Sequence, residues 1–315
     1  MFLKNVGIAA EQVAILYLMA VIGAICEKTG IFTESTAKKC TDLLFYVVTT
    51  AKILESFISL EYSKQTAKNL FIAIGCGLAM HAVASLGVAP LFNRSEPKKA
   101  SVYKFAAMFG NCGYMGLPLV DAVVGREGVF YCSAVIISFQ IFNFTYGVRL
   151  MTIGEGDGKS KIDFKKLILN PGVLPVFAGL PVFLLSLKLP GLITVPVTSL
   201  ASMNSPLAML IFGTFIANTD FKSVFKQWRM LCVALFKLVL MPACMMAAVK
   251  LIGLTGPLAL TLIVASATPP ANNTIMFSAK YDRDTGLASQ MVAVISFLSI
   301  LTLPVVIALS KVWIV

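Results

Sequence analysis

Long apolar runs are the feature of this sequence that most constrains its fold. Of the 315 residues, 58% are hydrophobic and only 13% are charged, whereas about a quarter of the residues of an ordinary soluble domain are charged. So few charges cannot cover a soluble core of this size, and a transmembrane helix needs about 20 mostly apolar residues. We therefore expect an all-α membrane protein, and we exclude a disordered chain, a secreted disulfide scaffold and a nucleic-acid-binding protein.

The apolar runs are numerous enough for ten transmembrane helices. Between the fifth and the sixth run lies a loop at residues 154–166, whose glycines and charges are typical of a solvated connection. This loop divides the chain into two candidate repeats of five spans each, at residues 1–153 and 167–315. The expected spans lie near residues 6–25, 43–60, 69–92, 102–122, 129–149, 168–187, 195–217, 231–249, 258–278 and 287–312.

Lysine and arginine are distributed unevenly between the two sides of these spans. The loops after the odd-numbered spans contain 17 of the 26 basic residues, whereas the opposite side, with both termini, contains 7. Because basic loops tend to stay in the cytoplasm, this bias predicts a cytoplasmic 154–166 loop and external termini in a multi-pass protein of the cell membrane. The net charge of +11 thus indicates orientation in the bilayer rather than a nucleic-acid partner.

Two segments form an internal repeat, one near the end of each half. The segment from Arg126 to Phe139 has the sequence REGVFYCSAVIISF, and the segment from Arg283 to Phe297 has the sequence RDTGLASQMVAVISF. In both segments a glycine precedes a Ser-Phe pair by the same interval, within the same span number of its half. Since five spans per half give the second half the opposite orientation, the pattern predicts two inverted repeats.

The fourth and ninth spans each contain helix-breaking residues at mid-span. Residues 110–120 have the sequence GNCGYMGLPLV, and residues 266–277 have the sequence SATPPANNTIMF. Proline removes a backbone donor and clashes with the preceding turn, so we expect two broken helices, with ordinary proline kinks as the alternative. Half-helix N-termini favour an anionic ligand, while asparagine amides can bind either a carboxylate or a cation. The candidate substrate-binding residues are Asn111, Gly113, Thr268, Pro269, Pro270, Asn272 and Asn273.

Three charged side chains are expected inside spans, where a lone charge costs about 2.5–3.5 kcal/mol. Lys52 and Glu55 are three residues apart and share a helix face, so they can neutralise each other; a gating or proton-coupling role is the alternative. Lys237 has no acidic neighbour in sequence. We expect it to support the crossing of the broken helices by lying beside their negative C-terminal ends, with snorkelling to the cytoplasmic interface as the alternative.

A histidine and two further carboxylates complete the polar set within or near the spans. His81, in the middle of the third span, titrates near neutral pH and is a candidate proton carrier; a hydrogen bond to a neighbouring helix is the alternative. Glu11 and Asp121 are interpreted as solvated residues without a site role. The seven cysteines lack CxxC spacing and His81 lacks ligand-type neighbours, so we expect no metal and no cofactor.

Three motifs resemble the auxin efflux carrier family, which is related to plant PIN-formed auxin exporters and distantly to bile-acid sodium symporters. The segment Asn111 to Val120, NCGYMGLPLV, is similar to the family's fourth-span signature, which includes Pro118. Pro269 followed by FSAKY, from Phe277 to Tyr281, resembles its crossover proline and the element after it. The run SPLAMLIFG, from Ser205 to Gly213, resembles its seventh span.

The resemblance implies a ten-span fold similar to sodium/proton antiporters, with spans 4 and 9 crossing. It also implies an elevator-type movement against a scaffold of spans 1, 2, 6 and 7. In such a fold Asn111 would contact a substrate carboxylate, and Pro269 and Pro270 would shape the crossover. Two departures are visible: residues 49–55 lack the proline that many bacterial members have in span 2, and residues 268–274 lack the acidic residue that binds sodium in bile-acid symporters.

The function expected from these features is secondary active transport of a small organic anion, such as a dicarboxylate or an aromatic carboxylate. A proton is the candidate coupling ion, the lipid bilayer is the surrounding partner, and a homodimer is the candidate assembly. The alternative is a membrane receptor or sensor that binds the same ligand without moving it. We do not expect an enzyme, because the sequence shows no nucleophile and base pair, carboxylate pair or metal cluster at a useful depth.

Overall fold

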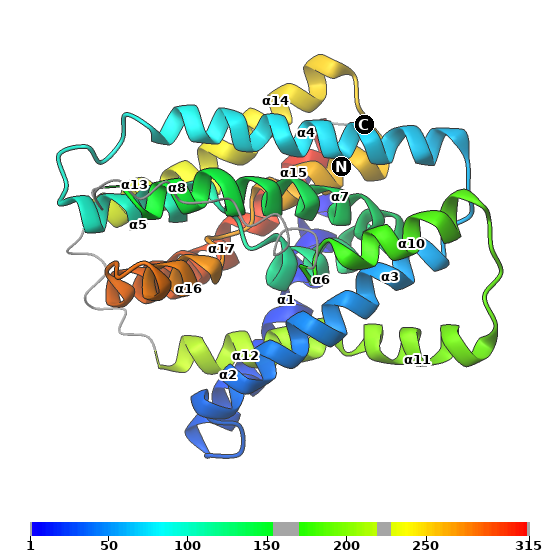
Figure 1. Cartoon of the computed structure of the whole chain (residues 1–315), viewed down its shortest axis with the longest axis horizontal. Helices are drawn as coiled ribbons and strands as arrows, with labels where there is room; N and C mark the ends of the chain where they lie inside the picture. The colour runs from blue at the N-terminus through cyan, green and yellow to red at the C-terminus, as the bar shows by residue number, and fades with distance from the viewer. Residues whose placement is uncertain (1, 154–169, 219–227, 314–315) are drawn as a thin grey trace.

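The computed structural model describes residues 2–153, 170–218 and 228–313, so the predicted 154–166 linker lies outside the described residues. The regular elements in these three ranges are all helices (Figure 1), which confirms the all-α fold for this part of the chain. Among the described residues, five helical segments are long and apolar enough to cross a membrane, as expected for a multi-pass protein; the ten-span inverted repeat stays a prediction. The five are Lys64–Val88, Arg126–Met151, Gly191–Ala217, Trp228–Ile252 and Thr285–Trp313.

A helix overlaps each apolar run of the first half, although the boundaries differ from those expected. The second run belongs to a longer helix that begins at Glu34, because the polar segment before the run has an amphipathic face with Ala37 buried. The elements are α1 (Phe2–Lys28), α2 (Glu34–Leu43), η1 (Leu44–Thr49), α3 (Thr50–Ile58), α4 (Lys64–Val88), α5 (Pro97–Met108), η2 (Cys112–Gly116), α6 (Leu117–Val123), α7 (Arg126–Phe142), η3 (Asn143–Gly147) and α8 (Val148–Met151).

Helices also make up the regular elements of the second half within the described ranges. The helix of its first run is described only in part, and the helix of its fourth run is interrupted between Ser266 and Asn273. The elements are α10 (Leu174–Leu184), α11 (Gly191–Ser202), α12 (Asn204–Ala217), α13 (Trp228–Leu235), η5 (Phe236–Leu240), α14 (Met241–Ile252), α15 (Gly256–Ser266), α16 (Asn273–Lys280) and α17 (Thr285–Trp313).

Short π-helical stretches interrupt several of the long helices. Within the described ranges they are η1, η2, η3 and η5. Such stretches are rare, and they occur frequently at functional sites. Three of them contain a buried polar side chain, namely Thr49 in η1, Asn143 in η3 and Lys237 in η5. The irregular turns therefore direct attention to the polar interior of the molecule.

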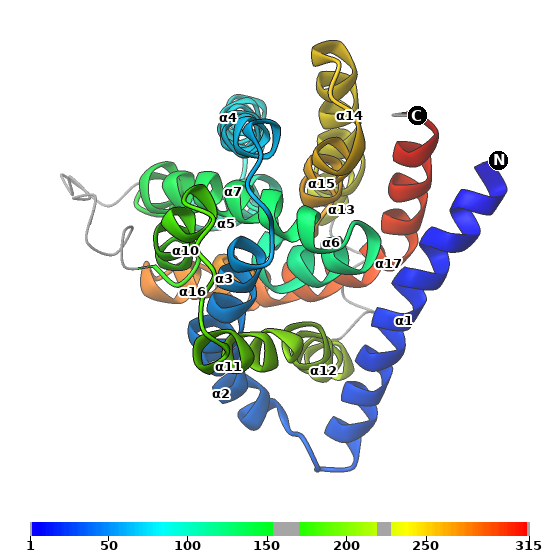
Figure 2. The same ribbon diagram turned by 90° about the vertical axis from the view of Figure 1, so that its right-hand side faces the viewer.

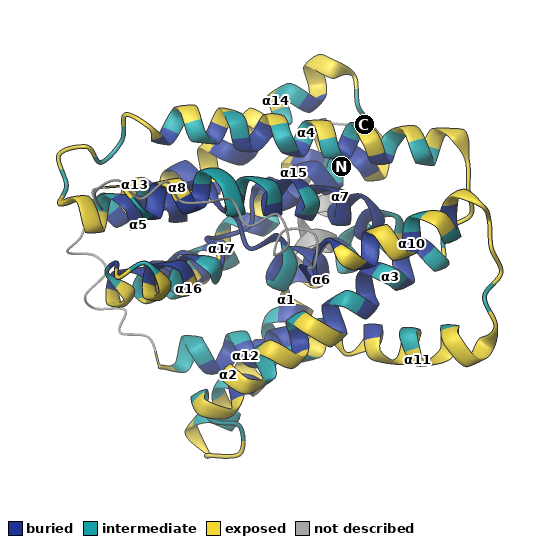
Figure 3. Cartoon of the chain, viewed as in Figure 1, coloured by how far each residue is buried: buried dark blue, intermediate teal, exposed yellow. Residues whose placement is uncertain are grey.

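The helices pack in two groups that meet at the centre of the molecule (Figures 1 and 2). In the first group, α12 contacts α1 and α2, and α3 contacts α10 and α11. In the second group, α4 and α15 pack on α7, α14 packs on α15, and α16 packs on α17. Contacts between the groups include α3 with α7, α1 with α17 and α1 with α6. Figure 3 shows that α7 is largely buried, whereas α11 is largely exposed.

Two glycines allow α1 and α12 to approach each other closely. A Cβ atom at Gly23 would overlap the carbonyl oxygen of Leu210, and a Cβ atom at Gly213 would overlap that of Ala20. Small residues at such crossings let helix backbones pack directly, which is a common basis of helix association in membranes. The first group is thus built on a tight backbone contact between its first and last helices.

Candidate functional site

Two interrupted helices pair with each other at their breaks. The helix of the fourth run stops at Met108 and resumes at Cys112, and the helix of the ninth run stops at Ser266 and resumes at Asn273. Between the breaks, the Asn111 N–H donates to the Pro269 carbonyl at 2.7 Å, and the Ala271 N–H donates to the Phe109 carbonyl at 2.9 Å. The two predicted breaks are therefore present, and backbone hydrogen bonds join them into a crossover.

Glycine and proline explain why the backbone is interrupted at these points. Pro269 and Pro270 have no N–H to donate, so helix α15 cannot continue through them. At Gly110 an added Cβ would lie 2.5 Å from the Thr268 Oγ1 and 2.8 Å from the Lys237 Nζ, so only glycine allows this close approach. Pro118 lies where the π-helical stretch η2 passes into α6, within the continuous helical segment Cys112–Val123.

The two resumed half-helices place their N-termini at the crossover. Asn111 is the N-cap of η2, and its Oδ1 accepts a hydrogen bond from the Tyr114 N–H at 3.3 Å. Because the side-chain oxygen is engaged in this cap, the Nδ2 group is the part of the amide left to donate to a ligand. α16 begins at Asn273, one residue after its N-cap Asn272. A helix N-terminus carries about half a positive charge, so two of them favour an anion here.

A small recess opens beside these N-termini. Its walls come from η1, the crossover, α7, Gly172 and the start of α16, and none of its lining residues is charged. The space within it that a water-sized sphere can occupy is about 20 Å³, which is enough for one water molecule but not for a carboxylate ligand. The lining residues are Phe45, Thr49, Gly110, Asn111, Cys112, Gly113, Tyr114, Ile136, Phe139, Gln140, Gly172, Ala271 and Asn273.

The predicted substrate-binding residues divide into two sets by their position. Asn111, Gly113 and Asn273 line the recess, whereas Thr268, Pro269, Pro270 and Asn272 do not. Thr268 is fully buried, and its hydroxyl donates to the Ala265 carbonyl at 2.7 Å at the end of α15. Their roles in substrate binding stay predictions.

Sequence reasoning missed a chain of amides that begins at the recess. Gln140 lines the recess, and its Nε2 donates to the Asn170 Oδ1 at 2.9 Å. The same oxygen accepts the Gly172 N–H at 2.8 Å, and the Asn143 Nδ2 lies 3.5 Å from the Gln140 Oε1. Uncharged amides within the apolar run at 129–149 were the available signal, because polar side chains inside spans tend to be functional.

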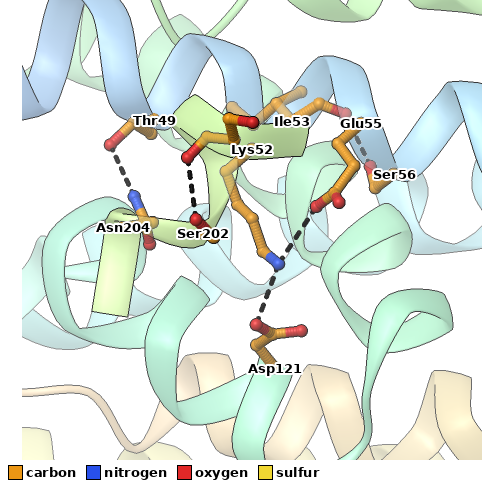
Figure 4. Close-up of polar contacts among 9 residues, drawn as sticks. Thr49, Lys52, Ile53, Glu55, Ser56, Asp121, Ser202 and Asn204 are labelled. Atoms are coloured by element: carbon orange, nitrogen blue, oxygen red, sulfur yellow. Dashed lines mark hydrogen bonds and ion pairs between the residues drawn. The ribbon is translucent and has the colours of Figure 1, made fainter. Parts of the chain in front are cut away.

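A charged triad lies close in sequence to Thr49, one of the residues that line the recess (Figure 4). The predicted ion pair between Lys52 and Glu55 is present, with Nζ and Oε2 separated by 3.2 Å. Asp121, interpreted from the sequence as merely solvated, is a third member, because its Oδ2 lies 2.9 Å from the Lys52 Nζ. Lys52 lies three residues after Thr49 of the recess wall, and Thr49 accepts a hydrogen bond from the Asn204 Nδ2 at 3.1 Å. The triad thus connects α3 to α6.

Lys237 and His81 lie at the crossover but do not line the recess. Lys237 is fully buried, so it does not snorkel to the surface, and its Nζ has no hydrogen-bond partner among the described residues. The His81 Nδ1 lies 2.7 Å from the Gly77 carbonyl of its own helix, rather than bonding to a neighbouring helix as the alternative had it. The His81 ring packs against Phe109 and Phe142.

Comparison with known proteins gives consistent matches along the chain. A family described as membrane transport protein matches residues 8–307. An uncharacterized transporter of Methanocaldococcus jannaschii is 23% identical over 306 residues, covering 94% of this chain and 97% of the relative. A Rhizobium meliloti protein provisionally named a malonate transporter is 24% identical over 239 residues, covering 74% of each chain.

Proposed function

The chain belongs to the auxin efflux carrier family of membrane transport proteins, and on that premise we propose that it is a secondary active transporter of a small organic anion. The observation that supports this most directly is the crossover, where two half-helix N-termini and the Asn111 amide face a recess without charged lining residues. Such an arrangement favours one carboxylate group, since helix ends and an amide donor replace its hydration. The provisional name of the Rhizobium meliloti relative agrees with a carboxylate substrate.

An elevator-type alternating-access movement accounts for the small recess. The recess is too narrow for a carboxylate ligand, so binding requires its walls to separate. Those walls come from both helix groups, with Phe45 and Thr49 from the first group and the crossover from the second. Sliding of the second group against the first would open the recess to one side of the membrane at a time.

The topology proposed for this movement is two inverted repeats of five spans, at residues 1–153 and 167–315. In this topology the 154–166 linker is cytoplasmic and both termini are external, in agreement with the bias of basic residues. A proton is the proposed coupling ion, with His81 and the Lys52 triad as its candidate carriers, and a homodimer is the proposed assembly. In a variant without the seven native cysteines, single cysteines introduced at Ser63, the N-cap of α4, and at Ser95, in the loop that follows α4, would test the orientation by labelling from opposite sides.

Uptake by proteoliposomes tests the transport function. The purified protein is reconstituted and offered labelled mono- and dicarboxylates, while pH, sodium and voltage gradients are imposed one at a time. Gradient-sensitive uptake that Asn111→Ala abolishes, and that Asn93→Ala in the loop after α4 leaves intact, is the expected result. Carboxylate binding without gradient-sensitive flux would instead support the receptor alternative, and wild-type rates in Asn111→Ala would remove the proposed site.

A further inference from the structure

Lys237 is a buried amine whose position the transport proposal does not use. It lies in the π-helical stretch η5 and is fully buried, and its Nζ has no hydrogen-bond partner among the described residues. The amine lies 2.8 Å, and the Lys237 Cε lies 3.0 Å, from the point that a Cβ of Gly110 would occupy. Lys237 therefore packs directly on the backbone of the crossover, outside the set of residues that line the recess.

The surroundings of the amine are negative because of backbone ends rather than carboxylates. α5 ends at Met108, and Gly110 follows that end. α15 ends at Ser266, and Thr268 follows that end. Gly110 and Thr268 both lie beside the Lys237 amine. Each helix C-terminus carries about half a negative charge. The ionisable groups found to interact with Lys237 among the described residues are Cys112 and His81, and neither is a carboxylate. Since an uncompensated buried charge is costly, an ammonium at this position depends on these helix ends for its stabilisation.

We propose that Lys237 is the charge-compensating residue of the crossover, which acts on the substrate carboxylate through the helix ends and does not touch it. The two N-termini contribute about one positive charge and the two C-termini about one negative charge. With the Lys237 ammonium added, the crossover has a net charge of about +1 and a bound carboxylate is balanced. Without the ammonium, the same carboxylate is left unbalanced in a low-dielectric interior. This inference rests on the proposed transport function.

Two measurable consequences follow for Lys237→Met, which keeps a long unbranched side chain and removes the charge. The dissociation constant of the carboxylate substrate rises by about tenfold, within the range of partly buried helix-end interactions. In addition, the second helix group, which moves in the proposed mechanism, carries one positive charge fewer in this variant. One elementary charge that crosses the whole membrane field changes an equilibrium by up to about 50-fold per 100 mV. Substrate exchange moves only the substrate-loaded form of the protein across the membrane. In Lys237→Met the net charge that moves with the substrate is therefore more negative by one elementary charge, and the voltage dependence of exchange shifts accordingly.

The experiment measures binding and voltage-clamped exchange in the reconstituted full chain. Lys250→Met is the matched control, because Lys250 lies on the same span but is exposed and packs over Trp313. We expect Lys237→Met to weaken binding and to shift the voltage dependence of exchange, while Lys250→Met resembles wild type. Unchanged affinity and unchanged voltage dependence in a folded Lys237→Met protein would overturn the proposal.

Two further variants keep the proposal testable if Lys237→Met does not fold. Lys237→Arg retains the charge and Lys237→Gln removes it, so we expect the arginine variant alone to keep the wild-type voltage dependence. If the two variants behave alike, or neither folds, side-chain size rather than charge is what the site requires and the proposal is wrong. A wild-type protein that neither binds nor exchanges any carboxylate would instead refute the proposed function itself.

Discussion

Replacement of Lys52 by methionine tests whether the charged triad stabilises the fold. The Lys52 Nζ lies 2.9 Å from the Asp121 Oδ2 and 3.2 Å from the Glu55 Oε2. The exposed fractions of the three side chains are 10% for Lys52, 11% for Glu55 and 28% for Asp121, so water screens the carboxylates only in part. Lys52→Met leaves two carboxylates close together without a cation, which is the costly way to break a buried ion pair.

The magnitude follows from the burial and from the charge balance. Removing one partner of a buried pair costs about 3–5 kcal/mol, and because Asp121 is partly exposed we expect a loss of about 3 kcal/mol for Lys52→Met. Asp121→Asn leaves the Lys52 and Glu55 pair intact and neutral, so its expected cost is about 1 kcal/mol. The double variant Lys52→Met, Asp121→Asn relieves one unpaired carboxylate and is therefore more stable than Lys52→Met alone.

The free energy of unfolding can be measured by titrating the detergent-solubilised protein with a denaturing detergent and following helix content. Lys68→Met is the matched control, because Lys68 is an exposed residue of α4. The triad argument requires a large loss for Lys52→Met, a small loss for Lys68→Met and non-additivity in the double variant. A loss for Lys52→Met no greater than that of the control, or a double variant whose loss is the sum of the singles, would refute it.

Three other predictions follow from the structure. Gly110→Ala introduces a Cβ that meets Thr268 and Lys237, so we expect a loss of about 1–3 kcal/mol in the free energy of unfolding and a loss of carboxylate flux. Gln140→Leu removes the donor to Asn170 and should weaken substrate binding while α7 stays folded, as measured by ligand titration and helix content. A hydrogen bond from Lys98 and its charge hold the pKa of Asp282 below its usual value. That contact is therefore kept above about pH 4 and lost as the pH falls further; Lys98→Met should raise the pKa of Asp282 in an NMR titration.

The parts of the site that depend on local sequence could be predicted, and the parts that depend on packing could not. Glycine and proline at mid-span indicated both helix breaks, because their effect on the backbone is local. Lys52 and Glu55 could be paired from their spacing alone. Asp121 could not be assigned to them, because it comes from another helix, α6, and only the folded chain brings its Oδ2 within 2.9 Å of the Lys52 Nζ. The bond between Gln140 and Asn170 was missed for the same reason.

The crossover also explains why the two breaks resemble each other less closely than the segments around Gly128 and Gly286 do. One break is built from Gly110, which provides room for Thr268 and Lys237, and the other from Pro269 and Pro270, which remove donors that lipid could not satisfy. The antiparallel bridge between Gly110 and Pro270 needs both properties at once. One segment must have no side chain at the contact, and the other must be the end of a helix. The two breaks therefore carry different residues because they meet each other: Gly110 leaves the room that Thr268 and Lys237 occupy, and the two prolines end helix α15.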